Sequence, residues 1–275
     1  MSRIADRFAQ LKAEGRAGLV SFITAGDPDR ARSQAILNGL PAAGADIIEL
    51  GMPFTDPMAD GPAIQEAGLR ALKAGASMAQ TLDMVRTFRS SDQATPIILM
   101  GYVNPVLAYG VQRFCSDSAG AGVDGLIIVD LPPEEDAPLR AAAEPHGLAI
   151  IRLATPTTDA KRLPRVLQGA SGFLYYVAVT GVTGGKQADV GDVAGALAAI
   201  RAHTDLPLAV GFGVKTPQQA AALGAHADAV VVGSAIVSVI KQALNDADLV
   251  DKSLAFVGSL AGGLSRARPQ KERVG

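Results

Sequence analysis

Three carboxylates lie within or just after one apolar run, in the stretch ELGMPFTDPMADGP (49–62). Glu49 belongs to the run itself, whereas Asp56 and Asp60 lie in the proline-rich segment behind it. A carboxyl group buried at the end of a strand has a raised pKa and can give and take a proton near neutral pH. Each acid also has a simpler interpretation. Glu49 can pair with Arg152, Asp60 can cap the following helix, and Asp56 can stabilise a turn.

Glycines that end two later apolar runs could hold a phosphate group. GFGVKTP carries Gly213, and VVGSAIV carries Gly233 followed by Ser234. Backbone N–H groups and a helix N-terminus after the last two strands of a barrel form a recurring phosphate site, although glycines end strands in many α/β proteins. The segment TGVTGGKQADVGD (180–192) is long enough to act as a lid. No Walker loop or dinucleotide fingerprint is present, so nucleotide binding is disfavoured.

Other chemistry is disfavoured by the residue types. A Schiff-base aldolase needs a buried lysine, and the predicted strands contain none. The histidines, His146, His203 and His226, lack metal-ligand spacing. Acid/base chemistry on a phosphorylated substrate with an apolar part remains. Candidates for an apolar slot, each of which is more simply barrel core, are Phe22, Met100, Ile127, Leu153, Tyr175 and Phe212.

The elements that must position these groups form a repeating pattern of strand and helix. Short apolar runs alternate with alanine-rich amphipathic stretches, which is typical of a parallel sheet. The eight predicted strands are 19–24, 45–51, 96–101, 124–130, 148–154, 172–179, 206–213 and 228–234. Eight strands in 275 residues favour a closed (β/α)8 TIM barrel over an open doubly wound sheet. An extra N-terminal helix, with Ile4, Phe8 and Leu11 on one face, and additional helices after strands 2 and 8 are expected.

The composition points to a small-molecule partner. Lys and Arg number 25 against 27 Asp and Glu, so no positive excess indicates binding to nucleic acid or to a membrane surface. No apolar window approaches the length of a membrane span. Cys115 is the one cysteine in the sequence and cannot form an internal disulfide, which fits the cytoplasm. Without a linker, we predict one barrel domain over residues 1–262 and a basic, flexible tail over 263–275.

Several motifs together resemble the tryptophan synthase α subunit family. They occur in the expected order over residues 1 to about 262, and they are SFITAGDP, ELGMPFTDPMADGPAIQ, GYVNP, GVTG, GFGV and VVGSAIV. The resemblance implies reversible retro-aldol cleavage of indole-3-glycerol phosphate to indole and glyceraldehyde 3-phosphate. It implies no cofactor and no metal in this chain.

The resemblance also assigns roles within the site. Glu49 matches the general acid/base that protonates indole C3 and takes the proton of the adjacent hydroxyl. Asp60 matches the carboxylate that stabilises positive charge near the ring nitrogen. Tyr175 matches a tyrosine beside the cleaved bond, and Thr183 matches a lid residue that closes toward Asp60. The positions that match the phosphate-binding backbone are Gly184, Gly213, Gly233 and Ser234.

A protein partner is implied as well. Asp56 and Pro57 match a contact with the family's β subunit, a pyridoxal-phosphate enzyme that receives indole through a tunnel, in an α2β2 hetero-tetramer. Asp130 resembles a residue of intersubunit communication, or it caps a helix near Pro132. Two alternatives remain open. One is a free-standing indole-3-glycerol phosphate lyase that releases indole, and the other is a noncatalytic phosphate-binding barrel that regulates a partner.

Overall fold

One sheet of parallel strands forms the centre of the computed structural model, which describes residues 2–178, 190–211 and 213–265. Within these residues the sheet has nine strands. They are β1 (Gly18–Thr24), β2 (Ile47–Gly51), β3 (Ile97–Gly101), β4 (Gly125–Ile128), β5 (Ala149–Ile150), β6 (Arg152–Ala154), β7 (Leu174–Val177), β8 (Leu208–Gly211) and β9 (Ala229–Val232).

The sheet closes because the segment of the fifth predicted strand, which is divided into β5 and β6 at Ile151, pairs with β4 on one side and with β7 on the other. The strand order is β5-β4-β3-β2-β1-β9-β8-β7-β6, so both ends of the sheet lie in one short chain segment. β5 pairs with β4, β6 pairs with β7, and the Ile151 N–H donates to the Leu126 carbonyl at 3.0 Å. The predicted (β/α)8 barrel is confirmed, with β5 and β6 together as one of its eight strands.

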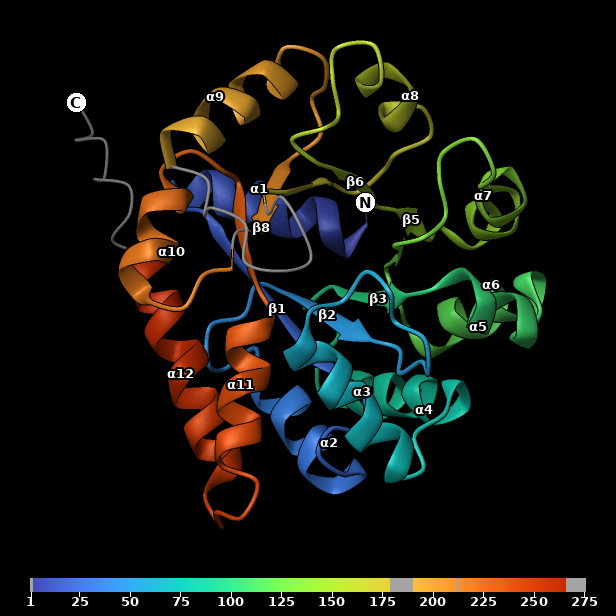
Figure 1. Cartoon of the computed structure of the whole chain (residues 1–275), viewed down its shortest axis with the longest axis vertical. Helices are drawn as coiled ribbons and strands as arrows, with labels where there is room; N and C mark the ends of the chain where they lie inside the picture. Colours follow the sequence, from blue (N-terminus) through green and yellow to red (C-terminus); the bar gives the residue numbers. More distant parts are fainter. Residues whose placement is uncertain (1, 179–189, 212, 266–275) are drawn as a thin grey trace.

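Helices surround the strands on all sides (Figure 1). The α-helices of the described residues are α1 (Arg3–Glu14), α2 (Arg30–Gly39), α3 (Pro62–Lys73), α4 (Met78–Arg89), α5 (Val103–Tyr109), α6 (Val111–Ala121), α7 (Ala137–Ala143), α8 (Leu163–Leu167), α9 (Val190–Arg201), α10 (Pro217–Gly224), α11 (Ser234–Gln242) and α12 (Leu249–Leu264), with a 3-10 turn, η1 (Glu144–His146). The expected helix pairs after the second and eighth barrel strands are α3 with α4 and α11 with α12. A further pair after β3, α5 with α6, was not predicted.

Helix α1 closes one end of the barrel, as its sequence predicts. The Ser2 hydroxyl accepts the Ala5 N–H at 3.3 Å, and Gly15 ends the helix at a φ of +68°, a conformation that glycine adopts without strain. Ile4, Phe8 and Leu11 are buried and belong to the same apolar cluster as the inward-facing side chains of the strands. The helix is therefore part of the barrel core (Figure 1).

Two buried aspartates fix the strand starts at this end of the barrel. Asp46 accepts two hydrogen bonds of 2.8 Å from Arg16. Asp124 accepts bonds from Arg89 at 2.7 Å and from Arg3 at 2.9 Å. Ion pairs and the plug helix thus occupy the N-terminal ends of the strands. The active sites of such barrels lie at the opposite end, where loops follow the C-terminal ends of the strands.

The last helix passes the predicted end of the domain. Gly263 and Leu264 are buried residues of α12, two positions beyond the expected boundary at 262. Residues 266–275 of the predicted basic tail lie outside the described residues. The division of the chain into a barrel and a tail stays a prediction.

Candidate functional site

Glu49 lies on β2 and points into the barrel. It is paired in register with Phe22 of β1 on one side and Ile98 of β3 on the other. The side chain is buried, and Oε1 has no hydrogen-bond partner among the described residues. Because burial disfavours the charged form, the pKa of Glu49 is raised to about 8. Arg152, the alternative partner considered from the sequence, instead contacts Asp136 on the outer side of the barrel wall.

Asp60 lies in the loop that follows β2, directly before α3. Gly61 is the N-cap of that helix, so the alternative interpretation of Asp60 as its capping residue is wrong. The Asp60 N–H donates to the Pro57 carbonyl at 3.0 Å, and the Gln65 amide donates to the Asp60 carbonyl at 2.9 Å. Burial raises the pKa of Asp60 to about 6, against an opposing hydrogen bond from Tyr102.

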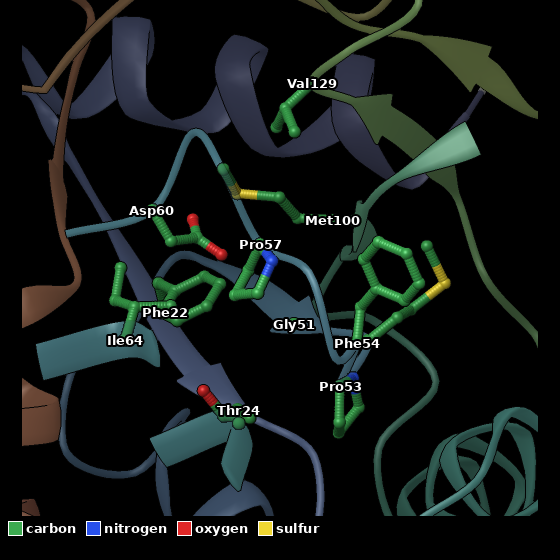
Figure 2. Close-up of a pocket in the computed structure, with 13 residues that line it drawn as sticks. Phe22, Thr24, Gly51, Pro53, Phe54, Pro57, Asp60, Ile64, Met100 and Val129 are labelled. Atoms are coloured by element: carbon green, nitrogen blue, oxygen red, sulfur yellow. The ribbon is translucent and has the colours of Figure 1, made fainter. Parts of the chain in front are cut away.

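The Asp60 carboxylate faces a cavity of about 20 Å³ whose other lining residues carry no charge. Figure 2 shows the carboxylate among Phe22, Pro57 and Met100. The cavity is lined by Phe22, Thr24, Gly51, Met52, Pro53, Phe54, Pro57, Asp60, Ile64, Gly68, Met100, Gly101 and Val129. Two of the predicted apolar contacts, Phe22 and Met100, are therefore brought to Asp60.

The other predicted apolar contacts are distributed differently. Leu153 lines a larger cavity of about 630 Å³ between the loops after β4 and β6, and Val129 lines both cavities. Ile127 is fully buried in the inner core. Phe212 lies outside the described residues. Val129 and Thr24 were missed from the sequence, because neither residue type signals chemistry.

Tyr175 and Glu49 share the barrel interior. Tyr175 belongs to β7 and packs with the inner cluster. Burial, and secondarily the charge of Glu49, raise the pKa of Tyr175 well above its usual value. A Cβ atom at Gly211 of β8 would lie 2.7 Å from the Tyr175 ring carbon Cε2. Position 211 therefore needs a residue without a side chain for the tyrosine to keep its place.

The predicted phosphate-binding residues lie after β8 and β9. Gly213 has a φ of +66°, which favours glycine, and Gly233 is the N-cap of α11. Ser234 is the first residue of that helix and is exposed. The first N–H groups of a helix have no partner within it and attract anions, so this arrangement can bind a phosphate. Thr183 and Gly184 lie outside the described residues.

The proposed partner contact lies on the outer side of the same loop. Asp56 is exposed and Pro57 is half-buried. Met58 is 72% exposed and Leu107 of α5 is 58% exposed. Asp130 accepts the Val103 N–H at 2.8 Å and so caps α5, not the helix after its own strand as the sequence suggested.

Among the residues that the structure describes, no group of three or more His, Cys, Asp or Glu side chains could hold a metal ion. The three histidines, His146, His203 and His226, are exposed. None of the described helices has the length and apolar character that crossing a membrane requires.

Comparison with known proteins gives consistent matches over nearly the whole chain. The family model described as tryptophan synthase alpha chain matches residues 8–263. The structure of tryptophan synthase subunit alpha from Legionella pneumophila str. Paris is 40% identical, with a TM-score of 0.90 over 96% of this chain and 98% of that one. A structure of tryptophan synthase from M. tuberculosis is 34% identical, with a TM-score of 0.86 over 96% of this chain and 99% of that one.

Proposed function

The chain belongs to the tryptophan synthase alpha chain family, and from this premise we propose how its residues carry out the family's reaction. The chain is a carbon–carbon lyase that cleaves indole-3-glycerol phosphate reversibly to indole and glyceraldehyde 3-phosphate, and the family needs no cofactor of its own for this step. The roles of the individual residues are proposals.

Glu49 is proposed as the group that moves both protons. With a pKa of about 8, roughly nine in ten Glu49 side chains are protonated at pH 7. The acid donates its proton to indole C3, which makes the ring an electron sink. The resulting carboxylate takes the proton of the hydroxyl on the adjacent glycerol carbon as the carbon–carbon bond breaks. The bonding electrons return to the indole ring, the hydroxyl carbon becomes the aldehyde, and Glu49 ends protonated as it began.

Asp60 is proposed to stabilise the cation formed between these steps. With a pKa of about 6, roughly nine in ten Asp60 side chains are ionised at pH 7. Protonation at C3 spreads positive charge toward the ring nitrogen, and a fixed carboxylate in an apolar cavity stabilises that charge. At the same pH the two acids would thus hold opposite protonation states, Glu49 as the proton donor and Asp60 as the anion.

Substrate binding is proposed to divide between an apolar and an anionic part. Phe22, Met100 and Leu153 would contact the indole ring, with Tyr175 beside the cleaved bond. The phosphate would bind at the backbone of Gly213, Gly233 and Ser234, where α11 begins. Thr183 and Gly184 keep their proposed lid and phosphate roles as predictions.

The family implies a β-subunit partner, and the finer statements about it are proposals. Asp56 and Pro57 would contact that subunit, and the exposed Met58 beside them supports an interface at this loop. We propose an α2β2 assembly in which the β subunit would carry pyridoxal phosphate and would receive indole from this chain. A cytoplasmic location, expected from the single cysteine, also stays a prediction.

The observation that carries the mechanism is a buried Glu49 that faces the barrel interior with a raised pKa and with an oxygen that has no hydrogen-bond partner among the described residues. The test is indole release from indole-3-glycerol phosphate by the purified chain, alone and with excess β subunit. Slow release that rises sharply with the partner is expected. Fast release that ignores the partner would favour a free-standing lyase, and no release in either condition would favour a noncatalytic barrel.

A further inference from the structure

Tyr102 connects the end of β3 to both ends of the loop that carries Asp60. It is 3% exposed and lies directly after β3. Its hydroxyl oxygen accepts the Ala59 N–H at 3.0 Å. Its ring lies 5.5 Å from the ring of Phe54, measured between centroids. One side chain from a neighbouring strand thus holds residues 54 and 59 of the loop.

The Tyr102 hydroxyl has one proton to donate, and the neighbouring groups decide where the O–H bond points. Because the oxygen already accepts the Ala59 N–H, the O–H proton is free to point elsewhere. The Asp60 side chain adjoins this hydroxyl, and the Tyr102 hydroxyl lowers the pKa of Asp60 against the effect of burial. Burial, and then the charge of Asp60, raise the pKa of Tyr102 well above its usual value, so the hydroxyl stays a donor over the working pH range.

The tyrosine is itself held in place. The next residue, Val103, donates its N–H to the Asp130 carboxylate at 2.8 Å. This bond joins the start of α5 to the loop after β4, so the backbone that carries Tyr102 is also fixed by a segment that follows the neighbouring strand. A side chain with a fixed backbone and a buried ring can hold a partner at a constant position with little loss of entropy.

Other charges near this loop are directed away from Asp60. On α3, Glu66 pairs with Lys241 at 2.5 Å and Arg70 pairs with Asp27 at 2.7 Å. On β2, Glu49 faces the barrel interior, and on the loop itself Asp56 is exposed. Asp130 is engaged with α5. Among the described residues, Tyr102 is the titratable neighbour that acts on the pKa of Asp60.

We propose that Tyr102 is a positioning residue for Asp60, and that its hydroxyl donates a hydrogen bond that holds the carboxylate in place for the substrate. The proposal rests on the proposed role of Asp60 as the group that stabilises the cation. Tyr102 acts through Asp60 and does not itself need to touch the reacting atoms. Tyr102 thus connects the Asp60 carboxylate to β3, although Asp60 itself lies in the loop that follows β2.

The test compares Tyr102→Phe with Tyr109→Phe. Tyr109 also donates its hydroxyl to an aspartate, Asp117, at 2.7 Å, but on the outer surface of the barrel. Carbon-13 NMR of the Asp60 carboxylate, identified with Asp60→Asn, measures its titration without any turnover. In Tyr102→Phe the titration midpoint should rise by about one pH unit, because a hydrogen bond that favours the charged form is lost. In Tyr109→Phe it should stay unchanged.

Activity supplies a second measurement. The acid limb of kcat/KM should move upward by the same amount in Tyr102→Phe, which lowers kcat/KM roughly fivefold at pH 6 and little near pH 7.5. An Asp60 midpoint that does not move in a folded Tyr102→Phe variant would overturn the proposal. If the Asp60 midpoint moves in Tyr102→Phe but Asp60→Asn cleaves normally, the proposal that Tyr102 positions Asp60 stands. The proposed role of Asp60 in stabilising the cation is then wrong.

A measurement on the unsubstituted chain covers the case in which Tyr102→Phe does not fold. The Tyr102 Cζ signal should shift with the same midpoint as Asp60, near pH 6, because the hydrogen bond strengthens when the carboxylate ionises. This transition should vanish in Asp60→Asn. A Tyr102 signal that stays constant from pH 4.5 to 8 would overturn the proposal without any substitution of the tyrosine.

Discussion

Glu49 and Phe22 are register partners across the β1–β2 pair, and both side chains face the barrel interior. On its other side Glu49 pairs with Ile98, so a carboxyl group stands between two apolar neighbours. Burial between them removes water from the carboxyl group, and this costs the charged form more free energy than the neutral form. The neutral form is favoured, and an ordinary glutamate becomes a proton donor at neutral pH.

The first prediction concerns the pH dependence of kcat/KM. Asp60 must be ionised and Glu49 protonated for the proposed reaction. Activity should therefore rise as pH increases through about 6 and fall as pH increases through about 8, which gives a maximum near pH 7. Steady-state rates from pH 5 to 9.5 test this shape. A profile that keeps rising beyond pH 9 would contradict protonated Glu49 as the acid.

The second prediction concerns the stability of Glu49→Gln. The folded-state pKa of Glu49 is raised from 4.5 to about 8, so stability from the neutral acid is present below pH 4.5 and is lost as pH rises to about 8. The Gln variant lacks this loss. Its free energy of unfolding, measured in urea, should exceed that of the parent by an amount that grows to a few kcal/mol between pH 5 and pH 8.5.

Glu135→Gln is the matched control, since it makes the same chemical change at an exposed side chain. Its stability difference from the parent should stay within about 0.5 kcal/mol at both pH values. An equal pH response of the two variants would mean that Glu49 ionises as freely in the folded chain as in the unfolded one.

The third prediction concerns the phosphate site. A Cβ atom at position 233 would lie 3.2 Å from the Cβ of Phe22, and a larger side chain would crowd the first N–H groups of α11. Gly233→Val should raise the KM for indole-3-glycerol phosphate about tenfold or more, which corresponds to about 1.4 kcal/mol of lost binding. Gly195→Val in α9, where a Cβ meets nothing within 4 Å, should leave KM unchanged. Equal KM values for the two variants would show that the substrate phosphate does not bind at the N-terminus of α11.

The fourth prediction concerns the helix that follows Asp60. Arg70 of α3 donates two hydrogen bonds, of 2.7 and 2.9 Å, to the buried Asp27 after β1. Arg70→Met would leave that carboxylate unpaired and should cost roughly 3 to 5 kcal/mol of unfolding free energy at pH 7. Arg86→Met, which breaks an exposed pair with Asp83, should cost less than about 1 kcal/mol. Similar losses of unfolding free energy in the two variants would show that the buried Arg70–Asp27 pair stabilises the fold no more than the exposed Arg86–Asp83 pair.

Much of the fold follows from local patterns in the sequence. Alternation along β2 correctly places Glu49 and Ile47 on the inner face and Ile48 on the outer one, because successive strand residues face opposite sides. The spacing of Ile4 and Phe8 also correctly predicts a helix with a buried face. These features depend on neighbours within a few residues along the chain.

Features that depend on distant segments were missed or misjudged. Asp130 caps α5, which precedes it by 27 residues, and sequence proximity had suggested the helix after it. Tyr102 belongs to the quoted GYVNP motif, but nothing local shows that its hydroxyl reaches the loop after β2. Arg152 alternates with Leu153 and faces outward to Asp136, so its partner is set by packing between elements.

The central claim is tested most directly by indole release from indole-3-glycerol phosphate by Glu49→Gln, measured with saturating β subunit beside the parent chain. We predict that release falls by about a thousandfold, within the range that a lost general acid/base gives. We also predict that the calorimetric Kd for indole-3-glycerol phosphate changes less than about threefold, because glutamine keeps the shape of the neutral acid. Release at the parent rate, with the substrate bound equally well, would contradict the assignment of Glu49 as the group that moves the protons.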